Sequence, residues 1–275
     1  KLVSTFVLDE ADRMLDMGFI HDIRRILAML PKERQTLFFS ATMPNEIEKL
    51  AATMLKNPIR VAVNPVSSTA EKVKQFVMYV DAPRKRDLLK FLMQDPKFHR
   101  VIVFTRTKFA ANRVSDVLSK NKIPSEAIHG NKSQNARTRA LDMFRNNKIQ
   151  VLIATDIASR GIDVDDISHV INFDVPNIAE NYVHRIGRTA RAGSEGIAIS
   201  FCSEEEKAFI RDIEKTIGQP IEVERNHPYH SEQVEKSAVL SKGKAKAQLE
   251  KKEGTKNTFH KKRKKRFFNF DKKKK

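Results

Sequence analysis

Short apolar runs alternate with helical patterns in the first part of the chain. The apolar runs predict strands at residues 3–8, 35–39 and 59–63. Apolar positions at helical spacing predict helices over residues 20–30 and 45–54. This alternation favours an α/β fold with a parallel sheet. Three strands cannot cover both faces of a domain-sized sheet, and the chain begins with Lys1, so we expect residues 1–64 to be the later part of a longer domain.

After a polar linker at residues 65–74, a longer alternation begins. Six apolar runs predict strands at residues 75–80, 100–104, 125–128, 150–154, 169–173 and 196–201. Five helical patterns lie between and after them, at residues 85–93, 108–120, 134–146, 178–186 and 204–217. The pattern predicts a second parallel-sheet domain over residues 75–222 that is complete.

The composition is typical of a globular protein. Hydrophobic residues make up 40% of the 275 residues, but no run of 18 apolar residues predicts a membrane span. The first residues do not resemble a signal peptide. The single cysteine, Cys202, follows an apolar run, so a buried structural thiol is a simpler interpretation than a catalytic one. This cysteine usage fits a reducing, cytoplasmic compartment.

The net charge of +18 is concentrated near the C-terminus. Residues 236–275 carry 17 Lys and Arg against three acidic residues, a net +14, whereas the preceding 235 residues carry only +4. Phenylalanines follow the basic run Lys261–Arg266, and periodicity is weak, so we expect residues 223–275 to be a disordered basic tail. We expect such a tail to bind single-stranded nucleic acid such as RNA, by releasing counterions and by stacking on unpaired bases. A solvated tail without a dedicated partner is the alternative, and an anionic membrane is a less favoured third.

A predicted strand runs directly into three acidic residues in the segment Val7-Leu8-Asp9-Glu10-Ala11-Asp12. Open α/β sheets bind ligands at the carboxyl ends of their strands. A nucleotide hydrolase needs one carboxylate that holds Mg²⁺ at the phosphates and another that orients the attacking water. Asp9 and Glu10 suit these two tasks. Taken alone, the same pattern is as typical of a solvated turn.

Three further motifs follow in order along the chain. They are Phe39-Ser40-Ala41-Thr42, Thr155-Asp156-Ile157-Ala158-Ser159-Arg160-Gly161-Ile162-Asp163 and His184-Arg185-Ile186-Gly187-Arg188-Thr189-Ala190-Arg191. With the acidic turn, this order resembles the DEAD-box ATP-dependent RNA helicases from Val7 to Gly218. The segment Ile128–Arg137 and the basic tail are similar to the bacterial RhlE-like branch of that family.

The resemblance implies two RecA-like parallel-sheet domains of the P-loop NTPase type, the first of them truncated. The chain contains no Gly-x-x-x-x-Gly-Lys-Ser/Thr phosphate loop, the element that holds the β and γ phosphates. We therefore expect the chain alone to lack half of its nucleotide site and to be inactive.

The resemblance assigns roles to the acidic turn. The family holds Mg²⁺ beside ATP at the position of Asp9 and orients the hydrolytic water at the position of Glu10. Asp12 is expected to tie the turn to Ser40 and Thr42, which would relay the nucleotide state to domain closure. Without the acidic residues nearby, the short hydroxyl side chains would more simply cap a helix.

Arg188 and Arg191 match the arginine fingers of the family, which stabilise charge at the γ-phosphate in the transition state. Their spacing of three puts both guanidinium groups on one side of a helical turn. His184 belongs to the same coupling segment. An isolated Arg-x-x-Arg pair would instead be a solvated basic turn. Ala190 stands where many relatives have glycine, a substitution that slightly restricts the backbone.

The motif that begins at Thr155 is expected to serve both ligands. By resemblance, Thr155 contacts an RNA phosphate, Arg160 braces the closed cleft, and Asp163 reaches the ribose of the nucleotide. For Arg160, a surface ion pair is the alternative.

The resemblance places further RNA contacts at Thr105, Arg106, Gly130, Gln134 and Arg137. Small residues let backbone amides approach phosphates, and arginines supply charge. None of these groups suits systematic reading of base edges, so we expect sequence-independent binding of a single strand or short duplex. For Arg106 and Arg137, a solvated helix start is an equally good interpretation.

The expected function of the intact protein is RNA-stimulated ATP hydrolysis coupled to local unwinding of short RNA duplexes. Candidate catalytic groups lie on both sides of the linker at residues 65–74, which agrees with a cleft that closes on its ligands. The alternative is a non-catalytic RNA-binding or annealing module, and a related DNA helicase is a weaker one. The RNA and the pathway are not indicated by the sequence.

Overall fold

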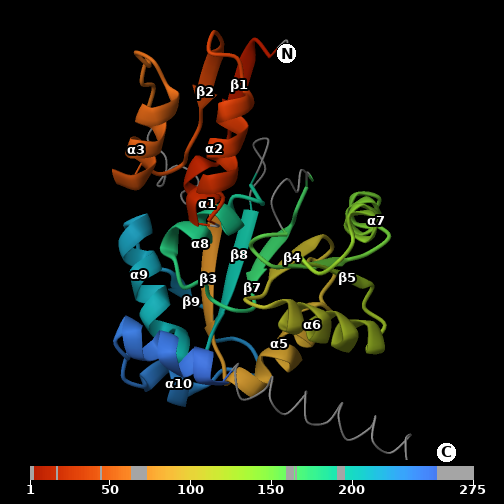
Figure 1. Ribbon diagram of the computed structural model, residues 1–275. Coiled ribbons are helices and arrows are strands. Elements are labelled where there is room, and N and C mark those ends of the chain that lie inside the picture. The colour runs from red at the N-terminus through yellow and green to blue at the C-terminus, as the bar shows by residue number, and fades with distance from the viewer. Residues whose placement is uncertain are drawn as a thin grey trace, which may run out of the picture. The chain divides into compact units, whose positions relative to one another are not determined.

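The computed structural model describes residues 3–252, apart from residues 17, 44, 63–72, 159–163, 165 and 191–195. The chain divides into two compact units, Lys1–Pro65 and Val66–Lys275, hereafter unit 1 and unit 2 (Figure 1). Each unit is described by itself.

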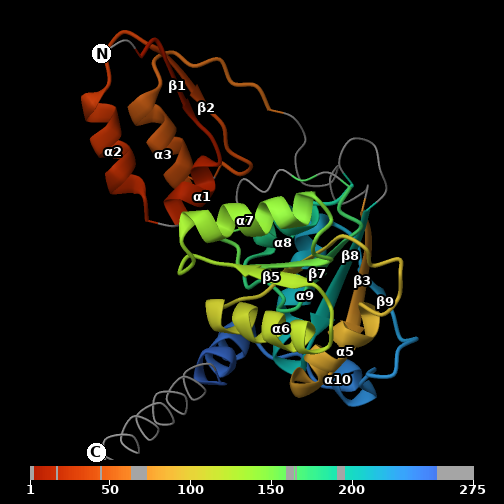
Figure 2. The same ribbon diagram turned by 90° about the vertical axis from the view of Figure 1, so that its right-hand side faces the viewer.

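Unit 1 is built on two parallel strands, β1 (Thr5–Leu8) and β2 (Gln35–Phe38). Three helices cover one face of this pair (Figure 2): α1 (Ala11–Asp16), α2 (Ile20–Met29) and α3 (Asn45–Met54). Their shared core consists of Leu8, Ala11, Ile23, Leu50 and Met54, with further apolar side chains around it. Val7 and Phe39 are half exposed. The short helix α1 was not expected, because we had interpreted the acidic segment as a turn.

The strand predicted at residues 59–63 is wrong for the part that the structure describes. Residues 59–62 have no regular secondary structure, and Ile59 and Val61 are 92% and 84% exposed. A strand requires a neighbour for its hydrogen-bond ladder. Within the described part of unit 1, the sheet contains only β1 and β2. The alternation of apolar and polar residues was therefore misleading without a pairing partner.

Unit 2 contains a seven-stranded parallel sheet in the order β5-β6-β4-β7-β8-β3-β9. Its strands are β3 (Val73–Tyr79), β4 (Val101–Phe104), β5 (Ser125–Ile128), β6 (Val151–Ala154), β7 (His169–Asn172), β8 (Gly196–Cys202) and β9 (Glu222–Val223). The central strands β4, β6 and β7 are buried at every residue, as expected of a parallel sheet covered on both faces. The six predicted strands are confirmed, with bounds that differ by at most two residues.

Helices cover both faces of this sheet (Figure 2). They are α5 (Lys85–Leu92), α6 (Lys108–Lys120), α7 (Gln134–Arg145), α8 (Ala179–Ile186) and α9 (Lys207–Ile217), with 3₁₀ turns η1 (Ala82–Arg84) and η2 (Glu204–Glu206) before α5 and α9. The core that α5 and α6 form on one face includes Leu88, Leu118 and Phe201. On the other face, Tyr182 and Ile213 belong to the core under α8 and α9, and Phe144 to the core under α7.

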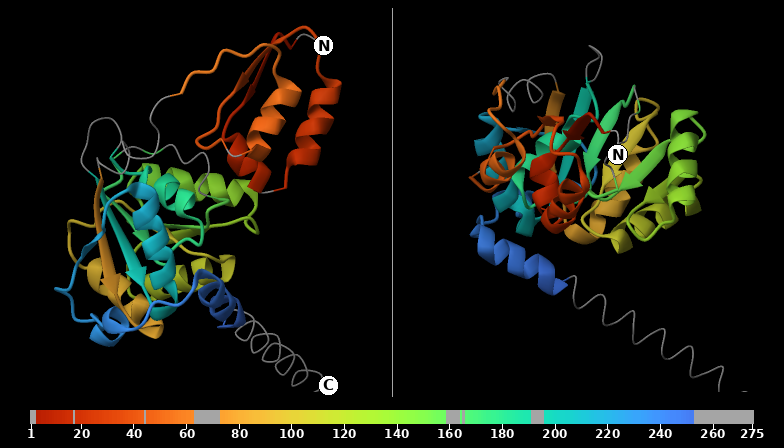
Figure 3. Two further views of the ribbon diagram at one scale, coloured as in Figure 1. Left: turned by 90° about the vertical axis from the view of Figure 1, so that its left-hand side faces the viewer. Right: turned by 45° about the horizontal axis from the view of Figure 1, so that its top comes forward.

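The chain beyond residue 222 is folded as far as the structure describes it, so the expected start of the disordered tail at residue 223 is corrected. A short helix α10 (Glu232–Lys236) and a helix over residues 242–252 follow β9, as the blue segments of Figure 3 show. Val234 and Ala245 are buried. Residues 253–275, the remainder of the predicted tail, lie outside the described residues.

Lys207 fastens this C-terminal extension, residues 223–252, to the domain. Its buried ammonium group donates to the carbonyl oxygens of Val234, Glu235 and Ser237 at 3.0, 2.7 and 2.6 Å. The Lys207 ammonium group therefore lies at the C-terminus of α10. Free carbonyl groups at a helix C-terminus favour a positive charge there. The sequence of residues 223–252 did not predict this contact, because the cation that makes it, Lys207, belongs to α9.

Every helix in the described ranges is too short or too polar to span a bilayer.

Candidate active site and RNA interface

Asp9 and Glu10 follow β1 directly, at the carboxyl end of the sheet in unit 1. Asp9 is exposed, and its Oδ1 accepts the Glu10 N–H at 2.8 Å. Glu10 has a φ of +50°, in the left-handed region. An L-residue with a β-carbon pays about 1–2 kcal/mol for that conformation. Backbone strain of this kind is concentrated at functional sites, and here it falls on the residue expected to orient water.

Asp12 joins the start of α1 to the segment after β2, as expected from the sequence. Its Oδ2 accepts both the Thr42 N–H at 3.0 Å and the Thr42 hydroxyl at 2.9 Å. The Ser40 hydroxyl accepts the Asp12 N–H at 3.2 Å and donates to the Thr42 carbonyl at 2.7 Å. Asp12 Oδ1 also accepts the Arg13 N–H, a bond that satisfies a free amide at the helix start. The Thr42 hydroxyl is thereby engaged with Asp12.

The carboxyl edge of the sheet in unit 2 is held by a buried arginine that we had not predicted. Arg185 on α8 is 2% exposed and forms a bidentate ion pair with Asp156, at 2.6 and 2.9 Å. It also donates to the Asn172 side chain at 3.1 Å and to the Asp174 carbonyl at 2.8 Å. The fork of the guanidinium group suits this arrangement. A sequence signal existed, because Arg185 lies three residues after the buried Tyr182 on the apolar face of α8.

A second buried network surrounds Glu206 in η2. The Lys85 ammonium donates to Glu206 at 2.5 Å and to the Phe173 carbonyl at 2.8 Å. The Arg106 guanidinium donates to Glu206 at 3.1 Å and to the Val175 carbonyl at 3.2 Å. Burial alone would raise the pKa of the Glu206 carboxyl, but Lys85 and Arg106 outweigh it and hold that pKa below its usual range.

These contacts change the expected roles of two RNA candidates. The Arg106 side chain is held by Glu206, so neither a solvated helix start nor a free phosphate ligand describes it in this structure. Thr105 is fully buried, and its hydroxyl donates to the Thr107 carbonyl. Thr105 therefore has no exposed surface for RNA in this structure, and its hydroxyl group stabilises the loop that contains Thr107.

Gly130 is exposed on a loop that His129 organises. The Asn131 N–H donates to His129 Nδ1 at 3.3 Å, so Nε2 carries the proton and donates to Asn112 at 2.9 Å. Burial, with Lys132 and Lys108 nearby, lowers the pKa of His129 and keeps the ring neutral. A β-carbon added at Gly130 would meet no protein atom within 4 Å. The loop thus offers open backbone in a basic setting.

The other RNA candidates lie on the same edge of the sheet or on α7. Gln134 is exposed and accepts the Arg137 guanidinium at 3.2 Å. Thr155 directly follows β6 and is buried. The sheet order puts β6 between β5, which precedes Gly130, and β4.

Arg188 and His184 lie half-buried at the end of α8, where the Arg188 N–H donates to the Arg185 carbonyl at 3.1 Å. Ala190 has a φ of +55°, which explains why glycine suits this position. The candidates Arg160, Asp163 and Arg191 lie outside the described residues.

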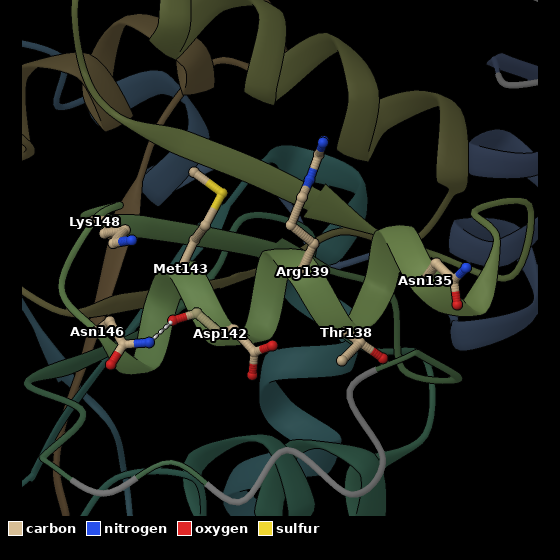
Figure 4. A pocket seen from close by; sticks show the side chains of 7 residues that line it. All are labelled: Asn135, Thr138, Arg139, Asp142, Met143, Asn146 and Lys148. Carbon is tan, nitrogen blue, oxygen red and sulfur yellow. Dashed lines mark hydrogen bonds between the residues drawn. The ribbon is translucent and has the colours of Figure 1, made fainter.

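Hollows open on the surface of the described part of unit 2. A shallow one of about 450 Å³ follows the outer side of α7 (Figure 4). Its lining residues are Asn135, Thr138, Arg139, Asp142, Met143, Asn146 and Lys148. It brings no candidate residue together, so we assign it no function. The other, of about 600 Å³, lies at the carboxyl edge beside Arg106 and Thr107.

Family comparisons identify the class of protein. The DEAD/DEAH box helicase model matches residues 1–50, and the helicase conserved C-terminal domain model matches residues 84–193. Among solved structures, the DEAD-box protein SrmB of E. coli, bound to regulator of ribonuclease activity A, is 32% identical. That likeness covers 62% of this chain and 98% of the SrmB chain in that structure, with a TM-score of 0.54. The chain belongs to the DEAD-box ATP-dependent RNA helicase family.

Curated relatives refine the comparison. A DEAD-box ATP-dependent RNA helicase CshA of Bacillus licheniformis is 45% identical over 78% of this chain and 44% of the relative. The Bacillus subtilis CshA is 44% identical over 78% and 43%. The chain thus spans less than half of these relatives. Since they are CshA proteins, the RhlE-like branch is not confirmed.

A solved structure with RNA also matches. S. cerevisiae Dbp5, bound to RNA and ADP BeF3, is 33% identical over 80% of this chain and 58% of that chain, with a TM-score of 0.71. The expected parallel-sheet α/β fold is confirmed by these likenesses and by the sheet of unit 2.

Proposed function

We propose that the chain is part of an ATP-dependent RNA helicase in which RNA-stimulated ATP hydrolysis is coupled to local unwinding of short duplexes. The observation that carries the proposal is the geometry of the acidic turn. An exposed Asp9 and a strained Glu10 follow a strand end, and Asp12 binds that turn to Ser40 and Thr42. A solvated turn would not require these long-range bonds.

The donor set of the turn fits Mg²⁺ that arrives with ATP. No cluster of three or more His, Cys, Asp or Glu side chains within the described ranges could hold a metal ion by itself. Asp9 presents one exposed carboxylate, and Mg²⁺ commonly binds through one or two carboxylates together with substrate phosphates and water. Bound there, Mg²⁺ would neutralise charge on the phosphates. We propose that Asp9 binds the ion and that Glu10 orients the attacking water.

Unit 2 supplies the other proposed groups. Arg188 and Arg191 would stabilise phosphate charge, and His184 and Arg160 would couple ATP to RNA. Asp163 would bind the ribose. The proposed RNA contacts are Gly130, Gln134, Arg137 and Thr155. Support for this part comes from the open loop at Gly130 and from the likeness to Dbp5, which is bound to RNA in its solved structure.

The test is RNA-stimulated ATP hydrolysis by the whole protein that contains this chain, compared with its Glu10→Gln variant. We expect at least about a hundredfold loss of turnover, because removal of a group that acts in proton transfer costs about 10²–10⁴-fold. The control is Glu33→Gln, an exposed site in unit 1 outside the acidic turn. Equal turnover by wild type and Glu10→Gln would refute the role of Glu10.

A non-catalytic RNA-binding or annealing module is the second candidate. It is favoured by one observation, that the described RNA candidates all belong to unit 2, which has its own sheet and cores. RNA annealing without ATP turnover by the whole protein would select this candidate. A cytoplasmic location stays a prediction, and Cys202 is, as expected, buried and unpaired.

A further inference from the structure

The larger hollow in unit 2, about 600 Å³, lies at the carboxyl ends of several parallel strands. Its walls include the start of α5, the segment after β4, the start of α6, η2 and the end of the helix over residues 242–252. Carboxyl edges of parallel sheets are where open α/β folds bind ligands. Only Arg106 among the lining residues was a candidate from the sequence, so the rest of this pocket has no assigned role.

The charges in the pocket do not balance. Five cations line it, against three carboxylates: Lys85, Arg86, Arg106, Arg113 and Lys252, with Asp174, Glu205 and Glu206. Each carboxylate is already engaged. Glu206 binds Lys85 and Arg106, Glu205 forms an ion pair with Lys252, and Asp174 accepts the Arg106 N–H at 2.9 Å.

Two of the five cations are not engaged by a carboxylate. Arg86 on α5 and Arg113 on α6 make no hydrogen bond or ion pair with any residue that the structure describes. Arg113 is half-buried, and Arg86 is exposed. Arginines that no ion pair holds favour phosphate, which the planar fork of the guanidinium group binds through two hydrogen bonds.

Phe109 adds a flat apolar surface to the same pocket. It is 49% exposed, and the Lys108 ammonium lies 5.4 Å from its ring centre. An exposed aromatic ring between cations is the usual platform on which single-stranded nucleic acids stack a base. An acidic peptide would use the arginines but would gain little from the ring.

The sheet order connects the pocket to the proposed RNA contacts. Strand ends follow one another along the edge as β5, β6, β4, β7, β8 and β3. Gly130 follows β5, Thr155 follows β6, and the pocket begins after β4 at Arg106 and Thr107. A strand that passes Gly130 and Thr155 would therefore reach the pocket next.

We propose that this pocket is a further RNA subsite, in which Arg86 and Arg113 bind backbone phosphates and Phe109 stacks a base of the same single strand. This inference rests on the proposed RNA-binding function of unit 2. The tail beyond Lys252 is an unsuitable occupant, because residues 253–275 carry 11 Lys and Arg against two acidic residues.

The test uses the 275-residue chain and a fluorescent oligouridylate, with affinity measured by anisotropy over a series of salt concentrations. The double variant Arg86→Gln/Arg113→Gln removes two phosphate ligands. Since each phosphate contact contributes about 0.7 to the logarithmic salt slope for single strands, we expect the slope to fall by about 1.4. The matched control is Lys120→Gln/Arg211→Gln, which removes the same charge at exposed positions outside the pocket.

Phe109→Ala supplies a measurement that charge alone would not change. We expect about tenfold weaker RNA binding with an unaltered salt slope, and loss of the ultraviolet crosslink between Phe109 and a 4-thiouridine-substituted strand. Thermal unfolding of each variant checks that the fold is retained.

The outcomes separate the two claims. If wild type binds the oligonucleotide and the double variant matches its control in slope, the subsite is wrong while RNA binding by unit 2 stands. If wild type does not bind RNA, both fail. Prevention of the crosslink by uridine monophosphate added before irradiation would identify a free-nucleotide site, and selective binding of polyglutamate would identify an acidic protein partner. Either result would overturn the RNA subsite.

Discussion

Both units place charged side chains at the carboxyl ends of parallel strands, but the two edges differ in burial. In unit 1, Asp9 is exposed and Glu10 is half-buried. In unit 2, Arg185 and Glu206 are 2% and 1% exposed and have several partners each. The same topological position therefore carries solvent-accessible carboxylates in one unit and buried ion pairs in the other.

The difference teaches how to interpret charge near a strand end. A buried ion must be compensated, so its partners are fixed before any ligand arrives. Arg106 illustrates this, since Glu206 holds the side chain that sequence comparison assigns to RNA. Groups left available for ligands are those without such partners, such as the Asp9 carboxylate in unit 1 and the Arg86 guanidinium in unit 2.

The largest effect is expected where the buried network of unit 2 is broken. Glu206→Gln leaves Lys85 and Arg106 without their carboxylate, and removal of one partner from a buried pair costs about 3–5 kcal/mol. Chemical denaturation followed by circular dichroism measures this loss. Glu204→Gln in the same turn is the control, because Glu204 is exposed. Equal stability of the two variants would mean that the network does not hold unit 2.

Acidification should weaken unit 2 through His169. Burial, with a smaller effect of Lys97, lowers the pKa of this ring to about 4, and the ring stacks on Phe98 at 4.1 Å. Because the pKa of His169 is lower in the folded state than in the unfolded state, protonation of the ring below pH ~6.5 favours the unfolded chain. Stability is therefore full above pH ~6.5 and falls toward pH ~4, by about 2 kcal/mol after allowance for solvent screening. Denaturation at several pH values should show this slope in wild type and a shallower one in His169→Phe.

In unit 1, substitution of the two neighbouring acidic residues Asp9 and Asp12 should have different effects on stability. Asp12→Ala removes the acceptor of both Thr42 bonds and should destabilise unit 1 by about 1–3 kcal/mol. Asp9→Ala, at an exposed position, should change stability by less than about 0.5 kcal/mol. Hydrogen exchange of the α1 amides distinguishes the two variants, and equal protection in both would contradict the proposed tie.

Gly130→Ala should affect binding without affecting the fold. The added methyl group meets no protein atom, so thermal unfolding should be unchanged. If an RNA phosphate approaches this backbone, loss of one hydrogen bond to a charged group lowers RNA affinity by about tenfold. Unchanged affinity in an anisotropy titration would remove Gly130 from the interface.

The smallest effect is expected at Ala190. Ala190→Gly relieves a φ of +55° and should raise the stability of unit 2 by about 0.5 kcal/mol, because part of the gain is lost with the methyl contacts of this half-buried residue. Differential scanning calorimetry measures the change. A lower unfolding temperature would show that the methyl contacts outweigh the strain.

Local periodicity predicted most elements of the fold. The bounds of α3 and α6 agree with the sequence pattern to the residue, since each helix has its own apolar stripe. The predicted strand at residues 59–63 was wrong, and the folding of residues 223–252 was missed. Both depend on contacts with distant elements, which a local pattern does not contain.

The candidate site was predictable to a similar extent. Motif order predicted the Asp12 contacts to Ser40 and Thr42, because short polar side chains at two adjacent strand ends meet at one edge. The roles of Asp9 and Glu10 stay predictions. Burial was not predictable from the motifs. They predicted an RNA contact at Thr105, although this residue is buried. They did not predict the ion pair between Arg185 and Asp156, because its two residues come from different elements.

The anchoring of residues 223–252 has a further consequence for solubility. β9 pairs with the outer side of β3, and beyond it the Ser231 N–H donates to the Tyr79 carbonyl. This segment covers what would otherwise be an open sheet edge. Bare edges recruit strands from other molecules. A protein shortened to end before β9 would therefore be prone to aggregate through β3, even though every helix and strand of the motif-bearing sheet were still present.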